Sequence, residues 1–171
     1  MKKQNPFISV CVPLFQTEMF LAQCLKSVLL QNFDDFEVVI VSDASDGKDS
    51  KGHSAKKIIR HTEKWAKKER AEKGLPPVEV RFIEHHENRG LVEARRTLVY
   101  EARGKYITML DSDDELETGA LRAFYKASNN IDIIHGTSTA GTISEDDTFT
   151  PSTLNRYGKI FYGKIVSGNK R

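Results

Sequence analysis

The acidic run at residues 111–114, Asp-Ser-Asp-Asp, has the residue types and the spacing of a metal site. Asp111 and Asp113 are two residues apart at the end of an apolar segment, and alternate side chains of an extended backbone point the same way. Two converging carboxylates repel each other unless a cation lies between them. Hard oxygen ligands of this kind suit Mg²⁺ or Mn²⁺. The alternative is a solvated acidic loop that precedes a helix and interacts with its dipole.

Short apolar segments alternate with amphipathic ones and predict the elements that position this run. Strands are predicted at residues 7–12, where Pro13 ends the strand, and at 36–41, 78–83, 105–110 and 131–134. Helices are predicted from Thr17, as N-cap, to Leu29, and over residues 54–72, 91–102 and 118–128, with a short one near 155–161. This alternation is typical of an α/β domain with a mainly parallel sheet.

Three polar loops follow strands in this scheme, at residues 13–18, 42–46 and 111–115. Ligands of open parallel sheets bind outside the carboxyl ends of the strands. We therefore expect the three loops to share one edge of the sheet and to form the site there.

Composition is ordinary for a globular protein: 171 residues, 39% hydrophobic and 29% charged. We expect a cytoplasmic protein, because the sequence has no signal-peptide pattern and no apolar run long enough to span a membrane. Cys11 and Cys24 are expected to be buried thiols. The basic stretch from Lys51 to Lys73 has helical spacing and indicates a solvated helix face, not a nucleic-acid site. Peripheral association with the inner face of a membrane is left open.

Two metal-dependent chemistries fit the position of the acidic run. One is glycosyl transfer from a nucleoside-diphosphate sugar, in which a cation offsets charge on the leaving diphosphate. The other is phosphoryl transfer of the haloacid-dehalogenase type, which the run from Tyr106 to Asp113 partly resembles, although Glu115 stands where that motif has Thr. A nucleotidyltransferase would need a glycine-rich loop after the first strand, and residues 13–17 contain no glycine.

Four segments, taken together, resemble glycosyltransferase family 2, which has the GT-A fold. They are Ile8 to Glu18, which is similar to a strand followed by Pro-x-Tyr-Asn-x-Glu; Gln31 to Ser45; Asn88-Arg89-Gly90 with Ala94-Arg95; and Gly104 to Asp114. The resemblance implies a Rossmann-like, three-layer α/β/α sandwich. It also implies a nucleotide-sugar-binding domain at residues 1–135 and the start of an acceptor-side region, apparently cut short, at 136–171.

The resemblance also implies roles for individual residues. Pro13, Phe15 and Glu18 would border the nucleotide, and Asp43 would accept a hydrogen bond from its base. Arg95 would approach the diphosphate, Asp111 and Ser112 would contact the nucleotide sugar, and Asp113, with Asp111, would ligate Mn²⁺ or Mg²⁺. A loop-turn role for Asp43, a helix-dipole role for Glu18 and a surface role for Arg95 are the alternatives. The histidines at 85, 86 and 135 match no motif and are expected at the surface or in the core.

The predicted reaction is inverting transfer of a hexose-type sugar, with a UDP-sugar favoured, to a saccharide or lipid-linked acceptor in cell-surface polysaccharide biosynthesis. Such a reaction needs a general base, and none is evident; residues 145–147, Glu-Asp-Asp, come too early for the family's base motif and are expected to form an exposed loop. Phe15, Gln16, Ser42 and Arg96 depart from the family pattern and leave the nucleotide open. We therefore expect a chain that binds the donor but transfers poorly; a non-catalytic nucleotide-sugar-binding module is the alternative.

Overall fold

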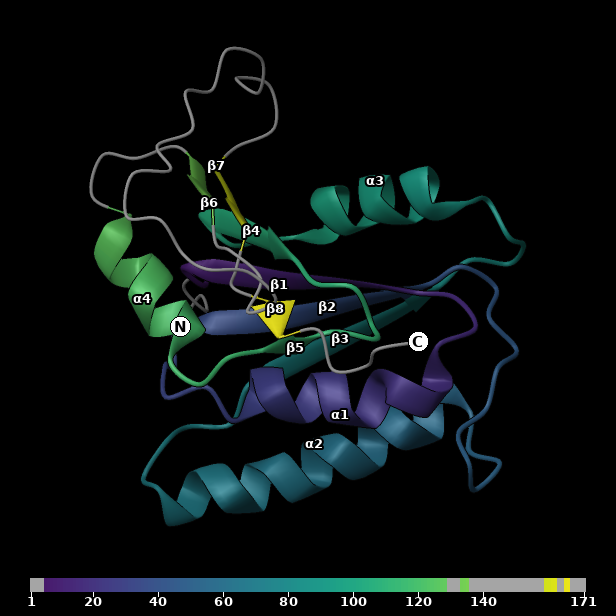
Figure 1. Ribbon diagram of the computed structural model, residues 1–171, viewed down its shortest axis with the longest axis horizontal. Coiled ribbons are helices and arrows are strands. Elements are labelled where there is room, and N and C mark those ends of the chain that lie inside the picture. The colour runs from purple at the N-terminus through teal and green to yellow at the C-terminus, as the bar shows by residue number, and fades with distance from the viewer. Residues whose placement is uncertain (1–4, 129–132, 136–158, 163–164, 167–171) are drawn as a thin grey trace.

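The computed structural model describes residues 5–128, 133–135, 159–162 and 165–166, and a parallel sheet forms its centre (Figure 1). The strand order is β3-β2-β1-β4-β7-β6, and each neighbouring pair is parallel. The strands of this sheet are β1 (Ile8–Leu14), β2 (Phe36–Ser42), β3 (Glu79–Glu84), β4 (Tyr106–Met109), β6 (Ile133–His135) and β7 (Lys159–Tyr162). A small antiparallel pair joins β5 (Glu115–Leu116) to β8 (Ile165–Val166).

Helices cover both faces of the sheet (Figure 1). They are α1 (Glu18–Leu29), α2 (Ala55–Glu72), α3 (Leu91–Glu101) and α4 (Ala120–Ala127). Along β1, Val10 and Val12 belong to the core cluster that α1, α2 and α4 share, whereas Cys11 belongs to the cluster under α3. Apolar residues on both faces explain why the central strands are continuously hydrophobic. The structure confirms the predicted α/β/α sandwich with a parallel central sheet.

The structure corrects the end of the first predicted strand. Pro13 does not stop β1; the strand continues to Leu14, and Pro13 is paired in register with Val41 of β2. The carbonyl of Cys11 accepts a hydrogen bond from Leu110, so it points toward β4. Pro13, two residues on, points the same way, beyond the end of β4 at Met109. Its missing N–H therefore costs no ladder hydrogen bond.

The predicted helix near residues 155–161 is wrong where the structure describes it, because Lys159–Tyr162 forms strand β7. This strand lies between β4 and β6, so its extended conformation is stabilised by pairing on both edges. Residues 155–158 lie outside the described part of the chain. The local pattern carried no signal for this pairing, since the partner strand β4 is about fifty residues away in sequence.

Other features agree with the sequence-based predictions. Both cysteines are free and buried. The basic side chains of α2 are mostly exposed, while Ile58, Ile59 and Ala66 of the same helix are buried against the core. Among the described residues, no helix is both long enough and apolar enough to cross a membrane.

A buried carboxylate, Glu37, ties the amino-terminal edge of the sheet together. One of its oxygens accepts hydrogen bonds from the Ser9 hydroxyl (2.7 Å) and from the Arg103 backbone (2.8 Å), and the other accepts from the Arg103 guanidinium. The next residue, Gly104, lies against the backbone of β1: a Cβ at this position would lie 2.5 Å from the Ser9 nitrogen. A larger residue would therefore clash. Burial by itself raises the pKa of Glu37, but the hydrogen bonds from Arg103 and Ser9 outweigh burial and hold the pKa below its ordinary value of 4.5.

We expect Glu37→Gln to lower the free energy of unfolding at neutral pH by about 2 kcal/mol, because a charge-assisted hydrogen bond is lost. A carboxyl whose folded pKa is lowered stabilises the fold fully above its unfolded pKa and loses that contribution as pH falls through the folded pKa. The difference between the two proteins should therefore shrink in acid. Urea unfolding at about pH 7 and about pH 3 measures it; an equal difference at both values would contradict the prediction.

Candidate functional site

A cavity of about 420 Å³ opens at the carboxyl edge of the sheet, which is the size range of small-ligand sites. Its wall comes from the end of β1, from the loops after β1, β2, β3 and β4, and from the start of α3. The residues that line it are Pro13, Leu14, Phe15, Thr17, Asp43, Asn88, Gly90, Leu91, Ala94, Asp111, Ser112 and Asp113. The three polar loops that the sequence analysis assigned to one sheet edge thus meet around one cavity.

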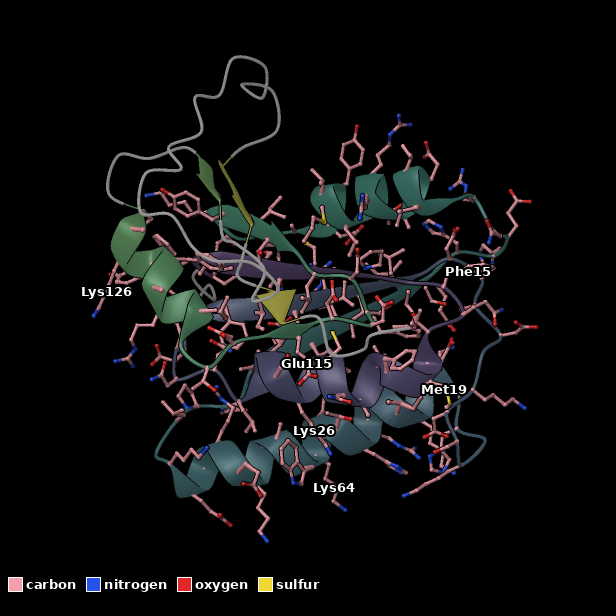
Figure 2. All side chains as sticks on the ribbon, in the orientation of Figure 1. Phe15, Met19, Lys26, Lys64, Glu115 and Lys126 are labelled. Carbon is pink, nitrogen blue, oxygen red and sulfur yellow. The ribbon has the colours of Figure 1, made fainter. Side chains whose placement is uncertain are left out.

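The loops after β1 and β2 carry unusual backbone. Gln16 and Ala44 have positive φ angles of 57° and 53°, in the left-handed region that non-glycine residues seldom adopt. Contacts between the loops hold this geometry: the Gln16 backbone donates to the Ser45 hydroxyl (2.8 Å), and the hydroxyls of Thr17 and Ser112 are 2.6 Å apart. Phe15 and Met19, which are labelled in Figure 2, lie at this end of the molecule and are exposed. The left-handed backbone at Gln16 and Ala44 is strained, and strained residues are frequent at ligand-binding sites.

The acidic loop follows β4 in a tight turn, in which the Asp114 backbone donates to the Asp111 carbonyl (3.0 Å). Burial raises the pKa of Asp114, and the nearby carboxylates of Asp113 and Asp111 raise it further. The Arg95 guanidinium lies 3.1 Å from Asp111 and offsets part of this negative charge. The loop therefore concentrates like charges beside the cavity, at a cost in repulsion that a bound cation would relieve.

The donor atoms in this loop fit a divalent cation that is shared with a ligand. Asp111 and Asp113 both line the cavity and supply hard oxygen ligands. In the part of the chain that the structure describes, no group of three or more His, Cys, Asp or Glu residues could enclose a metal ion. Magnesium commonly takes one or two protein carboxylates and completes its shell with water and phosphate oxygens. The residues present match that open arrangement and not a closed protein cage.

The third carboxylate of the cavity, Asp43, is held by the backbone directly before α3. Its side chain is 3% exposed and accepts hydrogen bonds from the backbone N–H groups of Arg89 (3.0 Å) and Gly90 (2.7 Å). Gly90 has a φ of 86°, which brings its N–H toward the carboxylate. Burial raises the pKa of Asp43, but these bonds and one from His85 outweigh burial, so the pKa lies below its ordinary value. The carboxylate is therefore ionised at neutral pH.

His85 is a residue of this site that the sequence analysis missed, since it was assigned to the surface or the core. Its Nδ1 lies 2.7 Å from Asp43 and its Nε2 lies 2.9 Å from the Thr97 hydroxyl. The signal for it was the strand ends: Ser42 pairs in register with Glu84, so the next residues, Asp43 and His85, are neighbours. His86, by contrast, is exposed as expected.

The structure brings most of the predicted site residues together. Pro13, Phe15, Asp43, Asp111, Ser112 and Asp113 line the cavity. Arg95 is not in its lining and reaches the site through Asp111. Glu18 is buried outside the lining, where it accepts a hydrogen bond from Ser45 (2.6 Å). A Cβ on Gly47 would come 1.9 Å from the Glu18 carboxylate, so this side chain packs against the loop after β2. The predicted acidic loop at residues 145–147 and the side chain of His135 lie outside the described part of the structure.

Among known proteins, residues 9–167 of the chain match the family model of glycosyl transferase family 2. Among curated relatives, the uncharacterized glycosyltransferase EpsJ of Bacillus subtilis is 30% identical over 151 residues, which are 87% of this chain and 38% of EpsJ. The putative colanic acid biosynthesis glycosyl transferase WcaA of Escherichia coli is 24% identical, over 98% of this chain and 57% of WcaA. The chain thus spans only part of the length of the relatives that it matches.

Solved structures share the fold. Staphylococcus aureus TarS 1–349 in complex with UDP-GlcNAc has a TM-score of 0.58 at 22% identity, over 80% of this chain and 36% of that one. The mannosyltransferase PcManGT of Pyrobaculum calidifontis, in complex with GDP-Man and Mn²⁺, has a TM-score of 0.60 at 20% identity, over 78% and 36% of the two chains. At these identities the likeness establishes the GT-A fold alone.

Proposed function

Because this chain belongs to glycosyl transferase family 2, we propose that its cavity binds the nucleoside diphosphate of a sugar donor, UDP in preference, for an inverting and metal-dependent transfer. One observation carries the proposal: a single cavity is lined by a half-exposed aromatic ring, a buried ionised carboxylate and two further carboxylates of an acidic loop. These are the groups that a base, its ring N–H and a cation-bound diphosphate require. TarS, which shares the fold, has been solved with UDP-GlcNAc.

The base would lie between Phe15 and Asp43. The Phe15 ring is 48% exposed and lines the cavity, so it can stack on a planar base. Asp43 is an ionised carboxylate that only accepts hydrogen bonds, and a uracil-type ring N–H is a suitable donor for it. Leu91, which is also exposed and lines the cavity, adds apolar surface.

The diphosphate would lie beside the acidic loop. Asp111 and Asp113 would hold a Mn²⁺ or Mg²⁺ ion, which offsets the negative charge that grows on the leaving diphosphate. Arg95, now paired with Asp111, would remain within reach of the same charge. Ser112, hydrogen-bonded to Thr17, keeps the acidic loop against the loop after β1. These residues bind and orient the donor; they do not activate the acceptor.

Inverting transfer also needs a carboxylate to take the proton from the attacking acceptor hydroxyl. The carboxylates among the described cavity residues are Asp43, Asp111 and Asp113, and all three are assigned to the donor. We therefore assign the general base to none of the described residues that line the cavity. The acceptor, a saccharide or lipid-linked hydroxyl, would approach the donor from the open side of the cavity.

Titration calorimetry with UDP and GDP, each with and without Mn²⁺, tests the proposal. We expect UDP to bind in the presence of Mn²⁺ and to bind at least about tenfold more weakly when the metal is chelated. Without the cation, the negative phosphate groups of UDP and the carboxylates of the acidic loop repel each other. GDP should bind more weakly than UDP. Failure of UDP to bind with Mn²⁺ present would rule out a donor site of this kind.

A further inference from the structure

His85 connects the cavity carboxylate Asp43 to helix α3. It follows directly after β3, and its backbone N–H extends the sheet ladder by donating to the Ser42 carbonyl (2.9 Å). Its ring then lies between two partners, Asp43 through Nδ1 (2.7 Å) and Thr97 through Nε2 (2.9 Å). The side chain is only 7% exposed. The ring is thus held at both nitrogens by residues of different elements.

These contacts determine where the ring carries its proton. Asp43 is ionised, and an ionised carboxylate only accepts, so Nδ1 of His85 has to be the donor of the 2.7 Å bond. In the neutral ring Nε2 is then the acceptor, and the Thr97 hydroxyl donates to it. Thr97 lies about two helical turns after Gly90, whose N–H also binds Asp43. Helix α3 therefore holds the carboxylate directly at its start and indirectly through His85.

The same contacts limit what Asp43 can bind. A carboxylate has about four acceptor positions. Three donor hydrogens bind it: His85 binds one oxygen, Gly90 binds the other, and the single Arg89 N–H lies between both at 3.0 and 3.1 Å. Counted as one position for each donor hydrogen, about one position is left for a ligand. A uracil-type ring offers one N–H between two carbonyls, whereas guanine offers a ring N–H and an adjacent amino group, which call for two acceptors.

We infer that His85 is a positioning residue that orients Asp43 and, by occupying one of its acceptor positions, makes the cavity selective for a base with a single ring N–H. The inference rests on the proposed function, since it requires Asp43 to meet the base. His85 itself touches no substrate; it acts through the carboxylate. His85 directly follows β3 and does not line the cavity. Nucleotide choice would therefore depend on a residue outside the cavity wall.

The test compares UDP with N3-methyl-UDP, which lacks the ring N–H, by calorimetry in the presence of Mn²⁺. In the unaltered protein UDP should bind much more tightly than its methylated analogue. In His85→Leu the affinity for UDP should fall about tenfold while that for N3-methyl-UDP changes little, so the ratio of the two affinities falls about tenfold. His85→Asn, whose side-chain N–H can take the place of Nδ1–H, should restore most of the ratio. His86→Leu, at the exposed neighbour, is the matched control.

The outcomes are distinct. A role limited to packing would lower the affinities for both ligands equally in His85→Leu, and the unchanged ratio would overturn the inference while UDP binding by the unaltered protein still supported the proposed function. Absence of UDP binding by the unaltered protein would overturn both. Nitrogen NMR of the histidine rings adds an independent readout, which requires no ligand. A proton on Nε2 and none on Nδ1 of His85 would overturn the inference.

Discussion

Replacing Asp113 by alanine should remove metal-dependent UDP binding and leave the protein at least as stable as before. We expect the affinity for UDP in the presence of Mn²⁺ to fall roughly 100-fold or more, since loss of even an outer-shell partner of a metal site costs 10- to 100-fold. Asp113 lines the cavity, and its charge raises the pKa of the half-buried Asp114. Removing that charge relieves repulsion within the loop, so the melting temperature should hold or rise slightly.

Two measurements separate these effects: calorimetry for the UDP affinity and thermal unfolding with and without Mn²⁺. A ligand that binds the folded state raises the melting temperature, so Mn²⁺ with UDP should stabilise the unaltered protein but not Asp113→Ala. Glu87→Ala is the control, because Glu87 is an exposed acid of the β3–α3 loop that does not line the cavity. Metal-dependent binding that survived in Asp113→Ala would show that the cation is held elsewhere.

Replacing Arg70 by methionine should produce the largest loss of stability, about 3 kcal/mol or more. The side chain is 1% exposed although it carries a charge, and it donates to four backbone carbonyls, those of Leu29, Gln31, Phe33 and Pro76, at 2.6–3.0 Å. Methionine fills similar space but leaves these acceptors buried without a donor. Replacing both partners of a buried ion pair by apolar groups can leave stability unchanged. Here the acceptors are backbone carbonyls, which a substitution at position 70 does not remove.

Urea unfolding measures this loss, and the melting temperature should fall by about 10 °C for a chain of this size. Lys67→Met, on the same helix, is the control, because Lys67 is exposed and its replacement removes a charge from the surface only. The segment that Arg70 binds, residues 29–33, leads from α1 into β2 and so supports the strand that directly precedes Asp43. Stability within about 1 kcal/mol of the unaltered protein would show that water replaces the guanidinium.

Several features followed from the sequence alone because their signals are local. Residues 36–41 form a strand since β-branched side chains in a short run have few other stable arrangements. Polar residues directly after strands 36–41 and 105–110 had to share an edge once the sheet was parallel, which brought Asp43 to the same cavity as Asp111 and Asp113. The order of strands and helices along the chain was enough to place that edge.

Other features depended on which residues meet across the fold. In α2 the buried stripe runs at intervals of four from Ile58 through Thr62 and Ala66 to position 70. An arginine at that position indicates exposure unless backbone carbonyls converge on it, and three of its four acceptors come from the distant segment 29–33. Pro13 could stay within β1 only because β4 ends earlier, and residues 159–162 became a strand only beside β4. His85 meets Asp43 only because the register of β2 and β3 places the two residues side by side. The periodicity of a sequence specifies each element and its buried face, whereas pairing, register and the partners of buried charges are set between segments far apart in the chain, where no local pattern records them.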